Sequence, residues 1–195
     1  MPDDWAPETV EPTTPPPILT VPAAGRADLR GRRVVIGLPG IGWRGDLRAD
    51  ATIGQSSRTY VPVLPEHEWY RSEAERTEVF APLVPIERVW VELASTAGTA
   101  TRAGSDVLSR LVSLDAPPQR DPVPVRELAH LTGRRLVQAD GTRAIRDLRA
   151  VTEPYQNHEG DICLRICAEQ DWYRWAWSGA APATREVPIY LLWAE

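Results

Sequence analysis

The acid/base chemistry that this chain could perform is concentrated in one short run, Glu66-His67-Glu68. A histidine between two carboxylates can accept and donate protons near neutral pH, and Tyr70 adds a phenol close by. If the chain is an enzyme, Glu66, His67 and Glu68 are therefore its expected site. The competing interpretation is a solvated loop beside a strand, in which the same side chains face water.

The two cysteines, Cys163 and Cys167, are the other pair that could bind a metal or form a disulfide. They lie in an apolar run without proline, which predicts a β-strand. Residues four apart in a strand share a face but are separated by about 13 Å, too far for a disulfide or for one metal ion. We therefore expect two reduced, buried thiols that act as small hydrophobic side chains, and neither a metal site nor a cofactor.

Other signatures of catalysis are absent from the sequence. The three histidines, at positions 67, 130 and 158, are far apart, and no nucleophile motif, phosphate-binding loop or HExxH motif occurs. All 22 basic residues are arginine, which excludes chemistry that needs a lysine. These observations favour a protein that binds rather than catalyses.

The two halves of the chain repeat one another. Four motifs recur in the same order: LRGRR (29–33) and LTGRR (131–135), DLRA (46–49 and 147–150), EWYR (68–71) and DWYR (171–174), and VPIERVWVE (84–92) and VPIYLLWAE (187–195). Four matches in the same order, each offset by about a hundred residues, indicate an internal duplication of a unit of roughly 65 residues. Units of that size bury only about 60% of their unfolded surface, so we expect the copies to pack together.

Short β-rich runs separated by Pro and Gly turns predict a mainly β fold, all-β or α+β. We expect two small SH3-like barrels or half-sandwiches packed with pseudo-twofold symmetry, with one or two short helices between them. Candidate helices are Ser105–Leu114 and Val125–Leu131. Prolines at 62 and 65 predict that the strand Tyr60–Leu64 is an edge strand or carries a bulge.

These elements predict four regions along the chain. Residues 1–22 form a flexible proline-rich tail, unless Trp5 and the pair Ile18-Leu19 dock it on the body; residues 23–93 are the first repeat, 94–122 a linker with a short helix, and 123–195 the second repeat. The runs EWYR and DWYR resemble the WYRA run of Tudor-type and related SH3-like barrels. The likeness covers four residues per copy, supports small β-barrels and implies no site.

Residues that occur in both copies are those that a shared fold needs, so we interpret them as architecture first. Trp69 with Trp172, and Trp90 with Trp193, are expected to be core tryptophans, because a large amphipathic ring anchors a small core. The alternating Asp and Arg of the DLRA motif predict cross-strand ion pairs. A tandem binding site that uses both copies is the alternative.

The difference that we weigh most follows the WYR motif. The first copy continues with Ser72-Glu73-Ala74, whereas the second continues with Trp175-Ala176-Trp177. If the segment is a strand, Tyr173, Trp175 and Trp177 point to one face as an aromatic stripe. This stripe is either the packing surface between the copies or an exposed recognition face, since aromatic anchors dominate protein interfaces.

Composition narrows the class of partner. A net charge of -5 and a pI near 5.3 argue against nucleic acid. No stretch is long and apolar enough to span a membrane, and the first residues lack the basic and apolar regions of a signal peptide, so we expect a cytoplasmic protein.

The hypothesis that follows is a non-enzymatic, cytoplasmic protein-binding or adaptor protein, one version being an inhibitor or immunity-type protein that masks another protein. Tyr173, Trp175 and Trp177 are its expected binding residues. The alternatives are a small enzyme with its site at Glu66, His67 and Glu68, and a nucleic-acid-binding tandem barrel. The sequence does not identify the partner or the oligomeric state.

Overall fold

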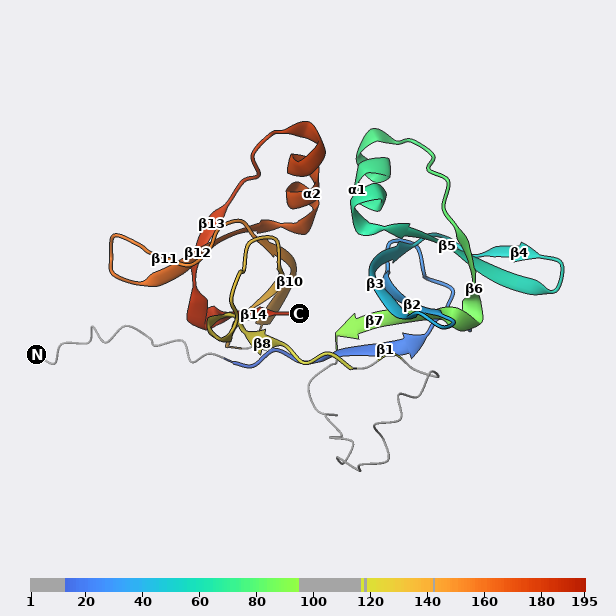
Figure 1. Cartoon of the computed structure of the whole chain (residues 1–195), viewed down its shortest axis with the longest axis horizontal. Helices are drawn as coiled ribbons and strands as arrows, with labels where there is room; N and C mark the ends of the chain where they lie inside the picture. The colour runs from blue at the N-terminus through green and yellow to red at the C-terminus, as the bar shows by residue number, and fades with distance from the viewer. Residues whose placement is uncertain (1–12, 95–116, 118, 142) are drawn as a thin grey trace, which may run out of the picture. The chain divides into compact units, whose positions relative to one another are not determined.

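The computed structural model describes residues 13–94, 117, 119–141 and 143–195 (Figure 1). The chain divides into two units. The N-terminal unit comprises residues 16–121, and the C-terminal unit comprises residues 1–15 and 122–195. The helix expected at Ser105–Leu114 lies outside the described residues.

The N-terminal unit is a curled antiparallel sheet with one α-helix. Its elements are β1 (Ile18–Pro22), β2 (Arg33–Leu38), β3 (Gly42–Ala49), β4 (Ile53–Gln55), β5 (Arg58–Pro65), α1 (Glu66–Glu75), β6 (Leu83–Pro85), the 3₁₀ turn η1 (Ile86–Arg88) and β7 (Val89–Ala94). The strand order is β1-β7-β2-β3-β5, and β5 pairs further with β4 and β6. Because only η1 separates β6 from β7, the two ends of the sheet are drawn together into a half-barrel.

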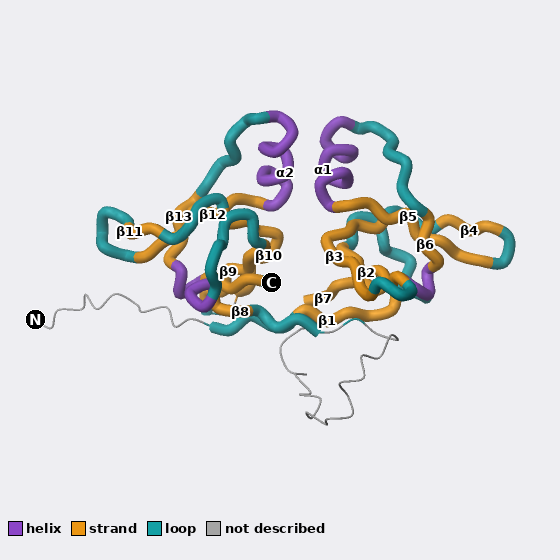
Figure 2. The backbone as a smooth tube through the Cα atoms, viewed as in Figure 1, coloured by secondary structure: helices purple, strands orange, loops and turns teal. Residues whose placement is uncertain are grey.

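The C-terminal unit has the same strands and α-helix in the same order, with one additional 3₁₀ turn after its first strand. They are β8 (Val123–Pro124), the 3₁₀ turn η3 (Val125–Glu127), β9 (Arg135–Asp140), β10 (Arg143–Ala150), β11 (Tyr155–Gln156), β12 (Ile162–Ala168), α2 (Glu169–Ser178), β13 (Arg185–Pro188), the 3₁₀ turn η4 (Ile189–Leu191) and β14 (Leu192–Ala194). The strand order β8-β14-β9-β10-β12, with β11 and β13 on β12, matches that of the first unit. The mainly β fold and the internal duplication are therefore confirmed (Figure 2).

The strand expected through EWYR and DWYR is wrong, because both motifs lie in helices. Each helix begins directly after an extended residue, Pro65 or Ala168, and carries two acidic residues in its first turn, where they interact favourably with the helix dipole. The buried residues of α1, Glu66 and Trp69, are three apart, which is the spacing of a helix face. The resemblance of WYR to a barrel strand fails for the same reason.

The two α-helices of the described residues are not among the helices expected from the sequence. Both α-helices of the described residues lie inside the repeats, between β5 and β6 and between β12 and β13, and neither is long or apolar enough to cross a membrane. The helix expected at Val125–Leu131 is reduced to the single 3₁₀ turn η3. Gly133 does adopt the expected left-handed conformation, with φ of 81°.

The strand with two prolines, β5, is not an edge strand. Tyr60 pairs with Ile53 of β4 and also with Pro85 of β6, so β5 has a neighbour on each side. Pro62 faces the break between β3 and β4, where its carbonyl oxygen accepts a hydrogen bond from the Asp50 backbone N–H at 2.8 Å. Residues 50–52 oppose only residues 61 and 62 between the paired positions, so the extra residue lies in the segment that joins β3 to β4 and not in β5.

The end of the predicted tail belongs to the first sheet. Ile18–Pro22 is strand β1 and pairs along its whole length with β7. Ile18 is 4% exposed, so the chain is anchored at this point by a buried side chain and a hydrogen-bonded ladder. Each unit has an apolar core of its own, built on Val34, Leu47 and Val61 in the first and on Leu136, Leu148 and Leu164 in the second.

Candidate functional site

The acid/base candidates do not converge on one site. Glu66 is 1% exposed and forms ion pairs with two arginines, Arg33 Nε at 3.1 Å and Arg48 Nε at 3.3 Å. The side chains of His67 and Glu68 are 64% and 45% exposed and lie 3.8 Å apart in the first turn of α1. The three residues lie in a helix instead of the loop expected for a non-catalytic role, and only Glu66 faces the protein interior.

Glu66 belongs to a polar network that joins three of the four repeated motifs. Arg48 of DLRA donates to the Tyr70 hydroxyl of EWYR at 2.7 Å and to the Gly31 carbonyl of LRGRR at 2.8 Å. Trp69 packs against the face of Gly31 that lacks a Cβ atom, with its ring 3.5 Å from where that atom would lie. The repeated motifs therefore fasten α1 to the sheet.

The C-terminal unit reproduces this network residue by residue. Glu169, fully buried, pairs with Arg135 at 3.7 Å and with Arg149 at 3.5 Å. Arg149 donates to the Tyr173 hydroxyl at 2.8 Å and to the Gly133 carbonyl at 3.0 Å. In both units the arginine of DLRA contacts the helix carboxylate, and the cross-strand Asp–Arg pairs expected from this motif stay a prediction.

The aspartate of DLRA has an unusual backbone conformation in both units. Asp46 and Asp147 have φ of 56° and 60°, and each lies where the hairpin register shifts, in β3 and β10. Aspartate tolerates this left-handed conformation better than most residues because its short side chain can bond locally. Each aspartate thus lies at a bulge, two residues before the arginine that contacts the helix.

The predicted aromatic stripe of Tyr173, Trp175 and Trp177 does not exist as such. On α2 Tyr173 and Trp177 are four positions apart and lie on the same face, whereas Trp175 points to about the opposite side, so the three do not form one stripe as they would in a strand. Tyr173 is tied to Arg149, and Trp175 packs edge-to-face on Trp172, with ring centroids 5.6 Å apart and planes at 83°. Trp177 is half-buried on the same helix.

The cysteines lie where the sequence placed them. Both are buried in strand β12 and neither forms a disulfide. Burial raises the pKa of both thiols, and that of Cys167 reaches about 11, with Asp171 adding to the effect. Such thiols are protonated at neutral pH and are poor nucleophiles.

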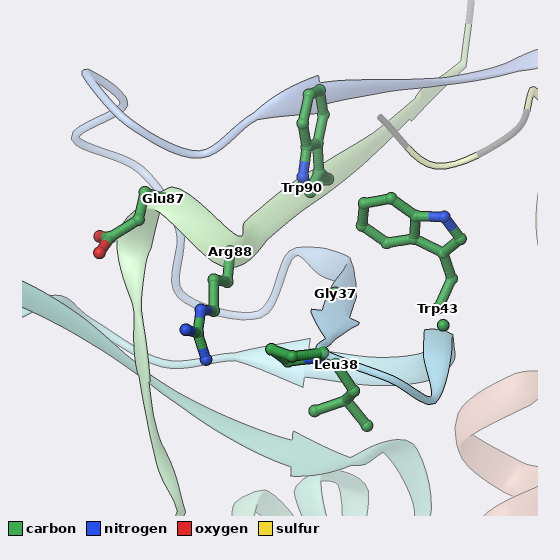
Figure 3. A pocket seen from close by; sticks show the side chains of 8 residues that line it. Gly37, Leu38, Trp43, Glu87, Arg88 and Trp90 are labelled. Carbon is green, nitrogen blue, oxygen red and sulfur yellow. The ribbon is translucent and has the colours of Figure 1, made fainter. Parts of the chain in front are cut away.

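A pocket of about 350 Å³ opens beside two tryptophans of the N-terminal unit (Figure 3). Trp43 of β3 and Trp90 of β7 meet edge-to-face, with centroids 6.3 Å apart and planes at 88°, so that they form a corner of two aromatic walls. Both rings are half-buried. The rest of the lining comes from β2, the turn that follows it, the start of β3 and η1: Gly37, Leu38, Pro39, Gly42, Glu87 and Arg88.

Gly37 makes this arrangement sterically feasible. A Cβ atom at this position would lie 2.9 Å from Cζ3 of Trp43, closer than such contacts occur in proteins. The equivalent pair in the C-terminal unit is Ala139 with Ala144, which face one another in the β9–β10 hairpin as Gly37 and Trp43 do in β2–β3. Two small side chains thus face one another in the C-terminal unit, whereas a glycine faces a tryptophan in the N-terminal unit.

Trp193, the counterpart of Trp90, has a different environment. It is 4% exposed and forms a small apolar cluster with Val137 and Ala139. Trp193 is therefore the core residue that the sequence predicted, whereas Trp90 is half-buried and lines a pocket.

No protein-family model matches the chain, and comparison with curated proteins and with solved structures found no match. The contrast between the two copies is therefore the evidence for a candidate functional site at Trp43 and Trp90.

The key residue of the pocket, Trp43, was missed by sequence reasoning. The sequence does contain a signal at this position: the first copy has WRGDLRA (43–49) where the second has AIRDLRA (144–150), so a tryptophan aligns with an alanine. The strand expected through DWYR instead predicted the aromatic face at Trp175 and Trp177. The pocket residues come from β2, β3, η1 and β7, and only the fold brings them together.

Proposed function

We propose that this chain is a non-enzymatic protein-binding or adaptor protein whose N-terminal unit holds its partner at the Trp43/Trp90 pocket. The observation that carries the proposal is the open corner of two tryptophans in one copy and its replacement by closed packing in the other. Half-buried tryptophans in a concave site are the residues that most often dominate binding energy at protein interfaces. The stability of the fold does not explain a half-buried tryptophan at position 43, because the second copy folds with Ala144 at the equivalent position.

The chemistry of the pocket supports binding over catalysis. Its lining is two indoles, two apolar residues, two glycines and one residue of each charge, Arg88 and Glu87. Glu87 is the only carboxylate of that lining, and an arginine is not a general base, so the pocket residues do not assemble an acid/base pair. The acid/base trio of α1 lies on other elements, and its buried member Glu66 is held by two arginines.

The test is capture of the partner by tagged full-length protein from its own cells, with two matched variants. Trp43→Ala removes one wall of the pocket and copies Ala144, whereas Trp177→Ala copies Ala74 of the first repeat and leaves the pocket intact. We expect Trp43→Ala to lose the partner while its melting temperature changes by only a few degrees, and Trp177→Ala to retain it.

The opposite pattern identifies the other surface. Loss of the partner by Trp177→Ala alone would make the exposed side of α2 the recognition face and would overturn the pocket assignment. Retention by both variants would exclude both aromatic surfaces as the principal contact.

A further inference from the structure

A second cavity of the N-terminal unit, of about 470 Å³, lies beside Trp69. Its walls come from α1, from the loop that joins α1 to β6, and from strands β4, β5 and β6. Pro62, Leu64 and Trp69 contribute buried apolar surface to it. The residues that line this Trp69 cavity do not overlap with those of the Trp43/Trp90 pocket, so the unit has two separate concave sites.

Four large apolar side chains at the Trp69 cavity are exposed to solvent. Phe80 is 93% exposed, and Ile53, Val79 and Leu83 are exposed as well. All four line the cavity, and we refer to them as the Phe80 rim. Large apolar side chains in water forgo the free energy that burial would provide, and their concentration at one place marks a site of protein–protein contact.

The C-terminal unit shows that the fold does not require the Phe80 rim. The segments 66–85 and 169–188 have equal length, and the pairing of β4 and β6 with β5 matches that of β11 and β13 with β12. One of the replacements, Glu186, accepts hydrogen bonds from the Tyr155 hydroxyl and the Asn157 amide. The corresponding residues are Tyr155 for Ile53, Pro182 for Val79, Ala183 for Phe80 and Glu186 for Leu83.

The C-terminal unit also indicates which group fills the space beside this helix. Trp175, the counterpart of Ser72, packs edge-to-face on Trp172, the counterpart of Trp69. In α1, Ser72 lines the cavity and donates its hydroxyl to the Trp69 carbonyl oxygen at 2.9 Å. The cavity thus opens where the second copy places an indole, so an aromatic side chain suits it in size and in ring-to-ring contact.

The charged residues of the Trp69 cavity are mostly acidic. Three carboxylates, those of Asp50, Glu73 and Glu78, line it together with Arg30. The Arg30 guanidinium is already engaged, since it lies 2.9 Å from Glu73, 3.7 Å from Asp50 and 5.9 Å from the centroid of the Trp69 ring. Within the described part of the chain, the Glu78 side chain has no hydrogen bond or ion pair. This excess of negative charge favours a cationic group on the ligand.

These charges, like the Phe80 rim, are specific to the first copy. The counterparts of its four charged residues carry no charge, so the acidic character of the cavity is not part of the shared scaffold. An apolar rim, an open space beside a tryptophan and an acidic lining occur together in one unit, as expected for parts of one binding site. The uncharged counterparts are Thr132 for Arg30, Val151 for Asp50, Ala176 for Glu73 and Ala181 for Glu78.

We infer that the Trp69 cavity binds a segment of a partner protein that inserts an aromatic side chain beside Trp69 and places a lysine or arginine on the Glu78 carboxylate. The ring takes the place that Trp175 has in the second copy, and the cation forms a charge-assisted hydrogen bond. This site goes beyond the proposed function, because it is separate from the Trp43/Trp90 pocket. A second copy of this chain is disfavoured as the occupant, because its net charge of -5 repels an acidic site.

The probe is the tripeptide RWR, acetylated and amidated at its ends, titrated into the full-length protein. Phe80 is the only phenylalanine of the chain, so incorporation of 4-fluorophenylalanine gives a single fluorine NMR signal at the cavity. We expect a saturable shift of that signal. The peptide RAR, which lacks the ring, should bind about tenfold more weakly or worse, and EWE, which reverses the charge, about fivefold more weakly or worse.

A pair of substitutions in α1 tests the position of the ring. Ser72→Trp copies Trp175 and fills the cavity from within, so RWR should bind about tenfold more weakly or not at all. Ala74→Trp copies Trp177 and adds the same indole to the same helix at a position that does not line the cavity. It should leave the affinity for RWR within about twofold of the unchanged protein. Thermal melting checks that both variants are folded.

The charge is tested at an exposed position where folding is not at risk. Glu78→Ala copies Ala181 and should weaken RWR by about two- to fivefold, as for an exposed ion pair, while EWE should bind no more weakly than before. The dependence of the RWR affinity on salt should decrease in this variant.

The inference is overturned by any one of three results: no fluorine shift with RWR, binding of EWE as tight as that of RWR, or binding of RWR that Ser72→Trp or Glu78→Ala leaves unchanged. Trp43→Ala should bind RWR normally. If RWR does not bind while partner capture depends on Trp43, the second site is wrong and the proposed function stands. If RWR binds as expected while capture is independent of Trp43, the reverse holds.

Discussion

The two units of this chain share a scaffold and differ at its surface. Both place a buried glutamate at the start of a helix between two arginines, and both pack a tryptophan on a glycine of the preceding turn. They part at the β2–β3 and β9–β10 hairpins, where one has Gly37 with Trp43 and the other Ala139 with Ala144. Residues that the copies share hold the helix to the sheet, and residues that distinguish them build the pocket.

The largest expected effect falls on the shared network. Replacing Glu169 with Gln removes the carboxylate that Arg135 and Arg149 both contact, and breaking a buried ion pair in this way costs about 3–5 kcal/mol of the free energy of unfolding. Glu66→Gln should cost a similar amount in the N-terminal unit. Denaturant unfolding of the two variants measures both. A change below about 1 kcal/mol in only one variant, the size seen for exposed pairs, would show that the two networks are not equivalent in energy, and such a change in both would contradict the expected cost.

The second comparison is between equivalent tryptophans. Trp193 is 4% exposed and Trp90 half-buried, so Trp193→Ala removes the larger buried area. We expect a loss of about 3 kcal/mol or more for Trp193→Ala, in the range of large-to-small core substitutions, and a clearly smaller loss for Trp90→Ala. In binding the order should reverse, with only Trp90→Ala weakening capture of the partner. Equal destabilisation by both variants would remove the contrast.

A single methyl group should close the pocket. Gly37→Ala places a Cβ atom 2.9 Å from the Trp43 ring and must displace it, so capture of the partner should fall several-fold with little change in stability. The reverse substitution, Ala139→Gly, should leave capture intact and cost about 0.5–1 kcal/mol through strand entropy. Unchanged capture by Gly37→Ala would mean that the position of Trp43 does not matter for binding.

The smallest effect concerns a difference in strand chemistry, Cys167 against its counterpart Leu64. Because burial raises the pKa of Cys167 to about 11 in the folded protein, its contribution to stability is complete below the thiol's ordinary pKa. That contribution is lost as the pH rises toward 11, since the unfolded chain ionises first. The free energy of unfolding should therefore fall less steeply over this alkaline range in Cys167→Ala than in the unchanged protein. Parallel slopes would contradict the raised pKa.

Where prediction failed, a local pattern had two interpretations. Tyr173, Trp175 and Trp177 alternate as in a strand, but Glu169, Trp172 and Tyr173 also have the i, i+3, i+4 spacing of a helix face, and the second pattern describes the fold. The buried partner of Glu169 decides between them. Arg149 lies on another strand, so its contact with the helix is invisible in a short window of sequence.

The sequence by itself determined the duplication, the mainly β composition and the buried strand of Cys163 and Cys167, because these rest on repeated motifs and local hydrophobic pattern. Only the tertiary structure decided that DLRA, WYR and the Gly31 turn form one network, and that Trp43, Arg88 and Trp90 line one pocket. Those residues are distant in the chain and meet through strand pairing across β2, β3 and β7. A pocket is a property of that register, in which a glycine opposite a tryptophan leaves the space that an alanine would fill.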